Sequence, residues 1–182
     1  MTRLKHDSEE PDSADRSAEP RFVVGDLAVV PPHGVAEVVG ISTEEIGGSA
    51  ATFYDLYVRQ GDLRMLVPAA KLGRVGLRQL IGPHEAPAVL AVLGKKRRGP
   101  RGPWVKQLKE LMAKVGSGSV YAAAEVARDL TTMKGRRPLS ARLTHWRDCA
   151  RELVIRELAS ATGRSEAELA SEVDAILASL RR

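Results

Sequence analysis

The chain has 182 residues, of which 43% are hydrophobic and 4% aromatic, and its formal net charge is +5. This length fits one domain or two small ones with mainly aliphatic cores, and the single cysteine, Cys149, excludes an internal disulfide. No apolar run approaches the ~20 residues of a membrane span and the first residues lack the apolar segment of a signal peptide, so we predict a cytoplasmic protein.

The first twenty residues differ in charge from the rest of the chain. Residues 1–20 contain six acidic and three basic side chains and few apolar ones, which predicts a disordered acidic tail. Without this charge of −3, residues 21–182 carry +8. A basic folded region favours a polyanionic or acidic partner, and a purely solubilising role for the charge is the alternative.

Residues 21–77 contain short segments rich in β-branched residues, separated by glycine and proline. Strands are predicted at 21–30, 35–46, 52–60 and 63–68. Several short strands with tight turns in so few residues indicate a small all-β barrel or sandwich. Within the third segment, Tyr54, Leu56 and Val58 alternate with more polar residues and are expected to form its apolar face.

Residues 78–103 connect this β region to the C-terminal part of the chain. LRQLIG and APAVLAVLG are apolar enough for two short helical pieces. The next stretch, KKRRGPRGP, carries five positive charges, and its glycines and prolines exclude regular structure. We therefore predict a basic loop immediately before Trp104.

From residue 104 onward the spacing of apolar residues is helical and predicts an all-α bundle of about four helices, residues 104–182. Breaks are expected at 116–119, 133–138 and 163. Ser140 is a candidate N-cap, and Ser165 with Glu168 three residues later forms a capping-box pattern.

Motifs of catalysis are missing from the sequence. It has no phosphate-binding G-x-x-x-x-G-K-[ST] loop and no G-x-S-x-G elbow, and its four histidines lack metal-ligand spacing. We therefore predict no catalytic residue, no metal, no cofactor, no small-molecule substrate and no enzymatic activity. The basic stretch 95–109 points to nucleic acid instead, because lysine and arginine neutralise phosphates. Spacing alone leaves Trp104 either as a buried anchor of the bundle or as a nucleic-acid contact.

Several segments, taken in their order along the chain, resemble a known family. FVVGDLAVVPPHGVAEVVGI, TFYDLYV, MLVPA and VGLRQLI precede the basic loop, and AEVARDL and LSARLTHWRDCARELVIREL come after Trp104. From Phe22 to about Leu158 this arrangement resembles the CarD/CdnL family of bacterial transcription factors. The resemblance implies an α+β multidomain chain: a small Tudor-like β-barrel in 21–77, which docks on the RNA polymerase β subunit, and a helical domain that contacts promoter DNA.

The resemblance also implies roles for individual residues. Trp104 matches a tryptophan that enters the minor groove as a wedge and stabilises the open complex, and Met112 matches its apolar support. The predicted DNA-binding residues are Trp104, Lys106, Lys109, Met112, Arg98 and Arg101. The predicted polymerase-binding residues are Glu44, Tyr54, Leu66 and Pro68. The resemblance implies a cytoplasmic, nucleoid-associated protein, and we expect a monomer.

Three positions depart from the family pattern. Gln107 stands where many relatives carry an arginine, and Glu44 and Leu66 lie near arginines that help polymerase docking in some relatives. The alternative is therefore a CarD-like adaptor whose barrel binds a different protein, with weak or no DNA binding. A repressor of specific operators is a third and weaker interpretation, because no helix shows base-reading residues at a suitable spacing.

Overall fold

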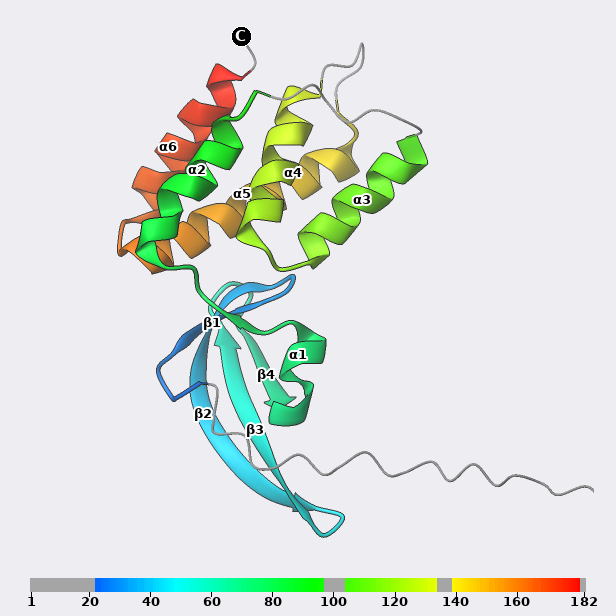
Figure 1. The fold of residues 1–182 in the computed structure, drawn as a ribbon, viewed down its shortest axis with the longest axis vertical. Helices are drawn as coiled ribbons and strands as arrows, with labels where there is room; N and C mark the ends of the chain where they lie inside the picture. The colour runs from blue at the N-terminus through cyan, green and yellow to red at the C-terminus, as the bar shows by residue number, and fades with distance from the viewer. Residues whose placement is uncertain (1–21, 97–103, 134–138, 181–182) are drawn as a thin grey trace, which may run out of the picture.

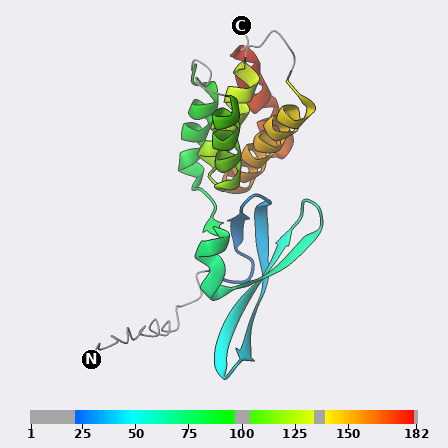
Figure 2. The ribbon, with the colours of Figure 1, turned by 90° about the vertical axis from the view of Figure 1, so that its right-hand side faces the viewer.

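The computed structural model describes residues 22–96, 104–133 and 139–180. Its strands form one sheet, and the helices α2 to α6 gather in a layer at one end of that sheet (Figure 1). The same end-to-end arrangement is visible after a quarter turn (Figure 2). No helix within the described ranges is long and apolar enough to cross a lipid bilayer.

The sheet has five antiparallel strands in the order β4-β3-β2-β1-β5. The strands are β1 Leu27–Val30, β2 Gly34–Ile46, β3 Ser49–Val58, β4 Leu63–Pro68 and β5 Arg78–Gln79. The sheet is open, since its end strands β4 and β5 do not pair, and the predicted closed barrel is therefore not what the described residues form. The chain between these two strands covers the sheet with a 3-10 turn, Ala69–Lys71, and a short helix, α1 Leu72–Val75.

The four predicted strands are present with shifted bounds, and the first of them is strand only at Leu27–Val30, because the chain turns at residues 24–25. The turn after β2 is made by Gly47 and Gly48, both with positive φ, which glycine adopts without steric cost. The hairpin of β2 and β3 extends away from the helices (Figures 1 and 2). The predicted helical piece at 77–82 is wrong, because Arg78 and Gln79 pair with Val29 and Ala28 of β1 as strand β5.

One face of the sheet and α1 enclose a first hydrophobic core. Its buried members are Phe22, Ala28, Val30, Ala36, Val38, Tyr54, Leu56, Val58, Val67, Leu72 and Leu77. The predicted apolar face of Tyr54, Leu56 and Val58 is confirmed, with each residue at most 1% exposed. Phe22 packs edge-on against Tyr54 with ring centroids 6.1 Å apart. Because Leu72 and Leu77 complete this core from α1 and its end, the sheet does not need to close on itself.

The helical layer consists of α2 Ala86–Gly94, α3 Trp104–Gly116, α4 Val120–Thr132, α5 Ala141–Thr162 and α6 Glu166–Ser179. Its helix starts agree with the predicted signals: Ser140 caps α5, and Ser165 with Glu168 forms a complete capping box on α6. Fully buried members of the second core include Val89, Leu93, Ala124, Val126, Ala127, Ala150, Val154, Leu158 and Val173. Helix α2 therefore packs into the helical layer, although its sequence predicted only a connecting segment.

Candidate interaction surfaces

Helix α3 packs against α4 at the outer side of the helical layer (Figure 1). Its buried residue Leu111 is 4% exposed and faces the core. Lys106, Lys109 and Met112 are exposed and succeed one another at intervals of three, so they share one face of the helix. Met112 is 47% exposed, so this face presents one apolar side chain beside the two lysines.

The lysines on this face differ from another lysine of the same helix. Lys114 donates to Glu125 Oε2 at 2.5 Å. Lys106 and Lys109 form no ion pair within the parts of the chain that the structure describes. Their charges are therefore available to an external anion such as a phosphate, whereas that of Lys114 is neutralised.

The remaining predicted DNA-binding residues are placed only in part. Trp104 is the first residue of α3, as the break before it predicted, but its side chain lies outside the described residues. Arg98 and Arg101 also lie outside them. Lys95 and Lys96, at the end of α2, are exposed. They add two positive charges on the side of the chain that leads to α3.

A second surface is the outer edge of the sheet at β4. This strand pairs with β3 on one side, and no other described strand pairs with its other side. Leu66 is 57% exposed on β4, and Pro68 is half-buried at its end. An open edge strand with an exposed apolar side chain is a template for an added strand from another protein.

Strand register places three of the four predicted polymerase-binding residues on one face. Glu44 lies opposite Ala51, Leu66 opposite Asp55, and Pro68 opposite Phe53. Residues that lie opposite each other, and positions two or four apart, point to the same side of a sheet. Glu44, Leu66 and Pro68 therefore share the outer face, away from the core.

Tyr54 requires a correction. Its neighbour in sequence, Asp55, lies on the outer face, so Tyr54 points inward, where it is 1% exposed and contacts Phe22. A side chain in that position supports the sheet and offers almost no surface for a partner to touch. The alternation of apolar and polar residues in 52–60 already indicates this inward orientation of Tyr54.

The other charges of the outer face are paired with each other. Arg64 donates to both carboxylate oxygens of Asp55, with Nη2 to Oδ2 at 2.6 Å, and this hydrogen bonding lowers the pKa of Asp55 below its ordinary value. Arg59 pairs with Glu37 at 3.2 Å. Glu44 forms no ion pair among the described residues, so its charge is available to a partner on this face.

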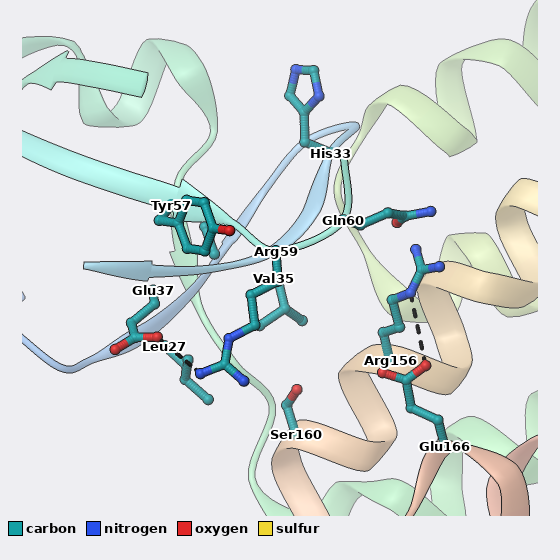
Figure 3. A pocket seen from close by; sticks show the side chains of 11 residues that line it. Leu27, His33, Val35, Glu37, Tyr57, Arg59, Gln60, Arg156, Ser160 and Glu166 are labelled. Carbon is teal, nitrogen blue, oxygen red and sulfur yellow. Dashed lines mark hydrogen bonds and ion pairs between the residues drawn. The ribbon is translucent and has the colours of Figure 1, made fainter. Parts of the chain in front are cut away.

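A groove of about 390 Å³ lies between the sheet and helices α5 and α6 (Figure 3). Arg59 and Glu37 line the sheet side as an ion pair, and Arg156 on α5 approaches Glu166 of α6 at 4.0 Å. Arg156 also pairs with Glu152 at 3.1 Å. Because its charges are balanced by one another, the groove shows no preference for an anion or a cation.

The described residues contain no group of three or more histidine, cysteine, aspartate or glutamate side chains that could hold a metal ion. Cys149 is half-buried on α5 with its Sγ 3.5 Å from Nε2 of His145. Burial, together with the charges of Glu152 and Asp148, raises the pKa of this thiol. A thiol held in its neutral form is a weak nucleophile, which agrees with a structural role.

Contacts between the sheet and the helical layer were not found from the sequence. Arg78 of β5 binds Glu157 of α5 with both ends of its guanidinium, at 2.6 and 2.8 Å. These residues lie 79 positions apart, and neither belongs to a motif that would connect them. Gln60 after β3 donates to Glu152 of α5 at 3.2 Å.

Comparison with known proteins divides the chain in the same way as the structure. Residues 22–81 match the family profile of the CarD-like/TRCF RID domain, and residues 88–174 match the profile of the CarD C-terminal domain. A curated relative, the putative transcription factor YdeB of Bacillus subtilis (strain 168), is 25% identical over 150 residues. The aligned part covers 82% of this chain and 98% of that protein.

Proposed function

The chain belongs to the CarD/CdnL family of bacterial RNA polymerase-binding transcription factors, and on this premise we propose that it stabilises the open promoter complex. In this proposal the sheet binds the polymerase β subunit and helix α3 contacts promoter DNA. The observation that carries the proposal is the exposed face of α3, where Lys106, Lys109 and Met112 come directly after Trp104.

Holding DNA and acting on its bases require different side chains. Lys106 and Lys109 are suited to phosphates, which supply affinity without sequence preference. An indole at the start of the same helix is suited to insertion at a weakened base step in the minor groove. We assign this wedge to Trp104, with Met112 as an apolar side chain a little over two turns further along the helix and Arg98 and Arg101 as additional phosphate contacts.

The sheet supplies the second attachment point. Backbone groups on the free edge of β4 would pair with a strand of the polymerase, and Leu66 and Pro68 would add apolar contact beside it. Backbone pairing depends little on side chains, so this mode tolerates the loss of the arginines that help docking in some relatives. The protein would then join polymerase and DNA at the upstream edge of the transcription bubble.

The experiment that tests this function measures the lifetime of open complexes formed with wild-type protein and with Trp104→Ala. Loss of the wedge should shorten the half-life by about tenfold, which corresponds to ~1.4 kcal/mol. Trp104→Phe, which keeps an apolar ring, should retain part of the effect. Binding to polymerase should be unchanged in both variants.

Thermal unfolding of the same variants separates the wedge from a buried anchor. An unchanged lifetime with an intact fold would refute the wedge. A markedly lower Tm in Trp104→Ala, with loss of every activity together, would instead assign the side chain to the core of the bundle.

Glu44 favours a second candidate function, an adaptor that recruits a different protein. It lies without an ion-pair partner among the described residues on the outer face of the sheet, and it reverses the sign expected from some relatives. Like charges at an interface are costly, so a partner with a basic surface would fit this face better. A pull-down of the polymerase β subunit with the full chain distinguishes the two functions: retention supports docking on polymerase, and its loss with a folded protein supports the adaptor.

A further inference from the structure

The sheet and the helical layer are joined by one covalent passage among the described residues, the segment from β5 to α2. Two domains joined by one short connection are expected to move relative to each other unless a specific interface holds them. The side chain of Arg78 provides such an interface. It starts in β5, where its backbone pairs with Val29, and it is 29% exposed.

Arg78 contacts two parts of the helical layer at once. Its Nη1 and Nη2 donate to the two carboxylate oxygens of Glu157 on α5, at 2.6 and 2.8 Å. Its Nε donates to the carbonyl oxygen of Gly118 at 2.9 Å. Gly118 lies in the turn between α3 and α4, so one guanidinium connects the sheet to α5 and to the end of α3.

Glu157 reinforces this arrangement from the helical side. It is 4% exposed, and besides the two bonds from Arg78 it accepts a bond from the backbone nitrogen of Ile81 at 3.4 Å. Its carboxylate therefore also binds the segment that leads from β5 to α2. A planar guanidinium and a carboxylate in bidentate contact fix direction as well as distance, which a lysine at the same place would not do.

The turn between α3 and α4 is also pressed against the sheet. Gly118 has a φ of +71°, and a Cβ added there would collide with the ring of Pro31 in the turn after β1. A Cβ on Gly34 in the same region would lie 3.1 Å from Leu153 of α5. Close packing at Gly118 and at Gly34 therefore adds to the contact that the Arg78–Glu157 pair makes between the sheet and the helical layer.

We propose that Arg78 and Glu157 are positioning residues that set the angle between the polymerase-binding sheet and the DNA-contacting helix α3. The inference rests on the proposed function, since it assigns the pair a role in open-complex stabilisation. A protein bound to polymerase and DNA at two points gains from the second contact only where its geometry permits both at once. A fixed angle places the start of α3 at one position on the DNA, whereas a free joint would spread it over many.

A purely stabilising role is the simpler interpretation, and it makes different predictions. Buried ion pairs are weak evidence for stability, because desolvation offsets much of their attraction. If the pair acted only through stability, its loss would lower Tm and weaken polymerase binding and DNA binding together. If the pair sets an angle, its loss should leave polymerase binding and DNA binding intact when each is measured alone. Only the stabilisation of the open complex, which needs both contacts at once, should be lost.

The first measurement is the distance distribution between spin labels on the two layers. Labels at Thr43→Cys on the hairpin and Ser171→Cys on α6, both exposed positions, are introduced with Cys149 replaced by serine. Glu157→Gln should broaden the distribution. Asp174→Asn is the matched control, because it neutralises a bidentate pair with Arg151, at 2.6 and 2.7 Å, that lies wholly within the helical layer. Its distribution should stay as narrow as that of the parent.

The second measurement is the open-complex lifetime of the same variants without labels. Glu157→Gln should shorten the half-life of the open complex by about tenfold relative to the parent. Its affinities for polymerase and for duplex DNA, measured separately, should each change by less than about twofold. Asp174→Asn should keep the parent lifetime. If Glu157→Gln does not fold, Arg78→Lys replaces it, since it keeps the charge and removes the bidentate geometry.

Rescue by a cross-link completes the test. Gln60 and Glu152 touch across the same junction at 3.2 Å, so cysteines at these positions can be joined by a short thiol-specific reagent. Joining them in the Glu157→Gln protein should restore the lifetime. A distribution that stays narrow in Glu157→Gln, or one that broadens with an unchanged lifetime, overturns the positioning role. If the parent protein itself does not extend the lifetime, the proposed function fails, and the distance measurement still decides whether the pair sets the angle.

Discussion

The outer face of the sheet and the outer face of α3 differ in whether their charged side chains are paired. On the sheet, Arg59 and Arg64 are both paired with carboxylates, and the exposed feature of the free edge is the apolar Leu66. On α3, Lys106 and Lys109 have no ion-pair partner among the described residues. One surface would thus bind through backbone pairing and apolar burial, and the other through charge.

This difference teaches how one small chain can serve two partners independently. Binding that releases counterions weakens steeply with salt, whereas burial of apolar surface does not. Ionic strength should therefore separate the two contacts. Three sets of variants test how the two surfaces are built, beginning with the largest expected effect.

Leu66→Glu should weaken polymerase binding at least tenfold, because it places a charge where the edge strand would be covered. The fold should be unaffected, since Leu66 is 57% exposed. Affinity is measured by titration of labelled polymerase. Met112→Glu is the matched control, an equally drastic change of an exposed apolar residue in the other region, and it should weaken duplex binding and spare polymerase. If Leu66→Glu instead weakened duplex binding and Met112→Glu weakened polymerase binding, the assignment of one partner to each surface would be wrong.

Replacing Lys106 and Lys109 together by alanine should reduce the salt dependence of duplex binding. Each phosphate contact contributes ~0.9 to the slope of log affinity against log salt, so the slope should fall by about 2. The measurement is a series of duplex titrations between low and physiological salt. Lys114→Ala should leave the slope unchanged, because Glu125 already neutralises that lysine. Equal slopes for all three proteins would show that the face of α3 does not contact phosphate.

The smallest effect concerns the paired charges of the sheet. Arg64 lowers the pKa of Asp55, so an NMR titration should give a value below the ordinary 3.8, and Arg64→Gln should raise it. Since the folded-state pKa is the lower one, the pair stabilises the fold above pH 3.8 and loses this contribution as pH falls through the folded-state pKa. The effect on stability should be slight, as Arg64 is 70% exposed. An unshifted Asp55 would mean that the pair does not persist in solution.

Local signals in the sequence predicted the elements well where each signal acts within a few residues. The two glycines after Ile46 predicted the hairpin, and Ser165 with Glu168 predicted the start of α6. The alternation through Tyr54 predicted the buried face of β3. These features depend on backbone geometry and on neighbours in the sequence, so they can be read from the sequence alone.

Features that depend on distant partners could not be predicted in this way. Strand β5 has two residues and forms because β1, about fifty residues earlier, offers it an edge. The contact of Arg78 with Glu157 likewise needs the folded layers to bring the two side chains together. Closure of the predicted barrel was not confirmed for the same reason, because whether a sheet closes depends on what covers its open side, here Leu72 and Leu77.

The position of Arg78 also limits how this protein can be recombined. Sheet and helices match two separate family profiles and look, in sequence, like modules that could be exchanged. Arg78, however, lies in the first matched region, and its partners Glu157 and Gly118 lie in the second. A chimera joined between the two regions would inherit one half of this contact. To keep the contact, a chimera would have to take Arg78 and its partners Glu157 and Gly118 from the same protein. The unit that can be exchanged is therefore larger than either domain.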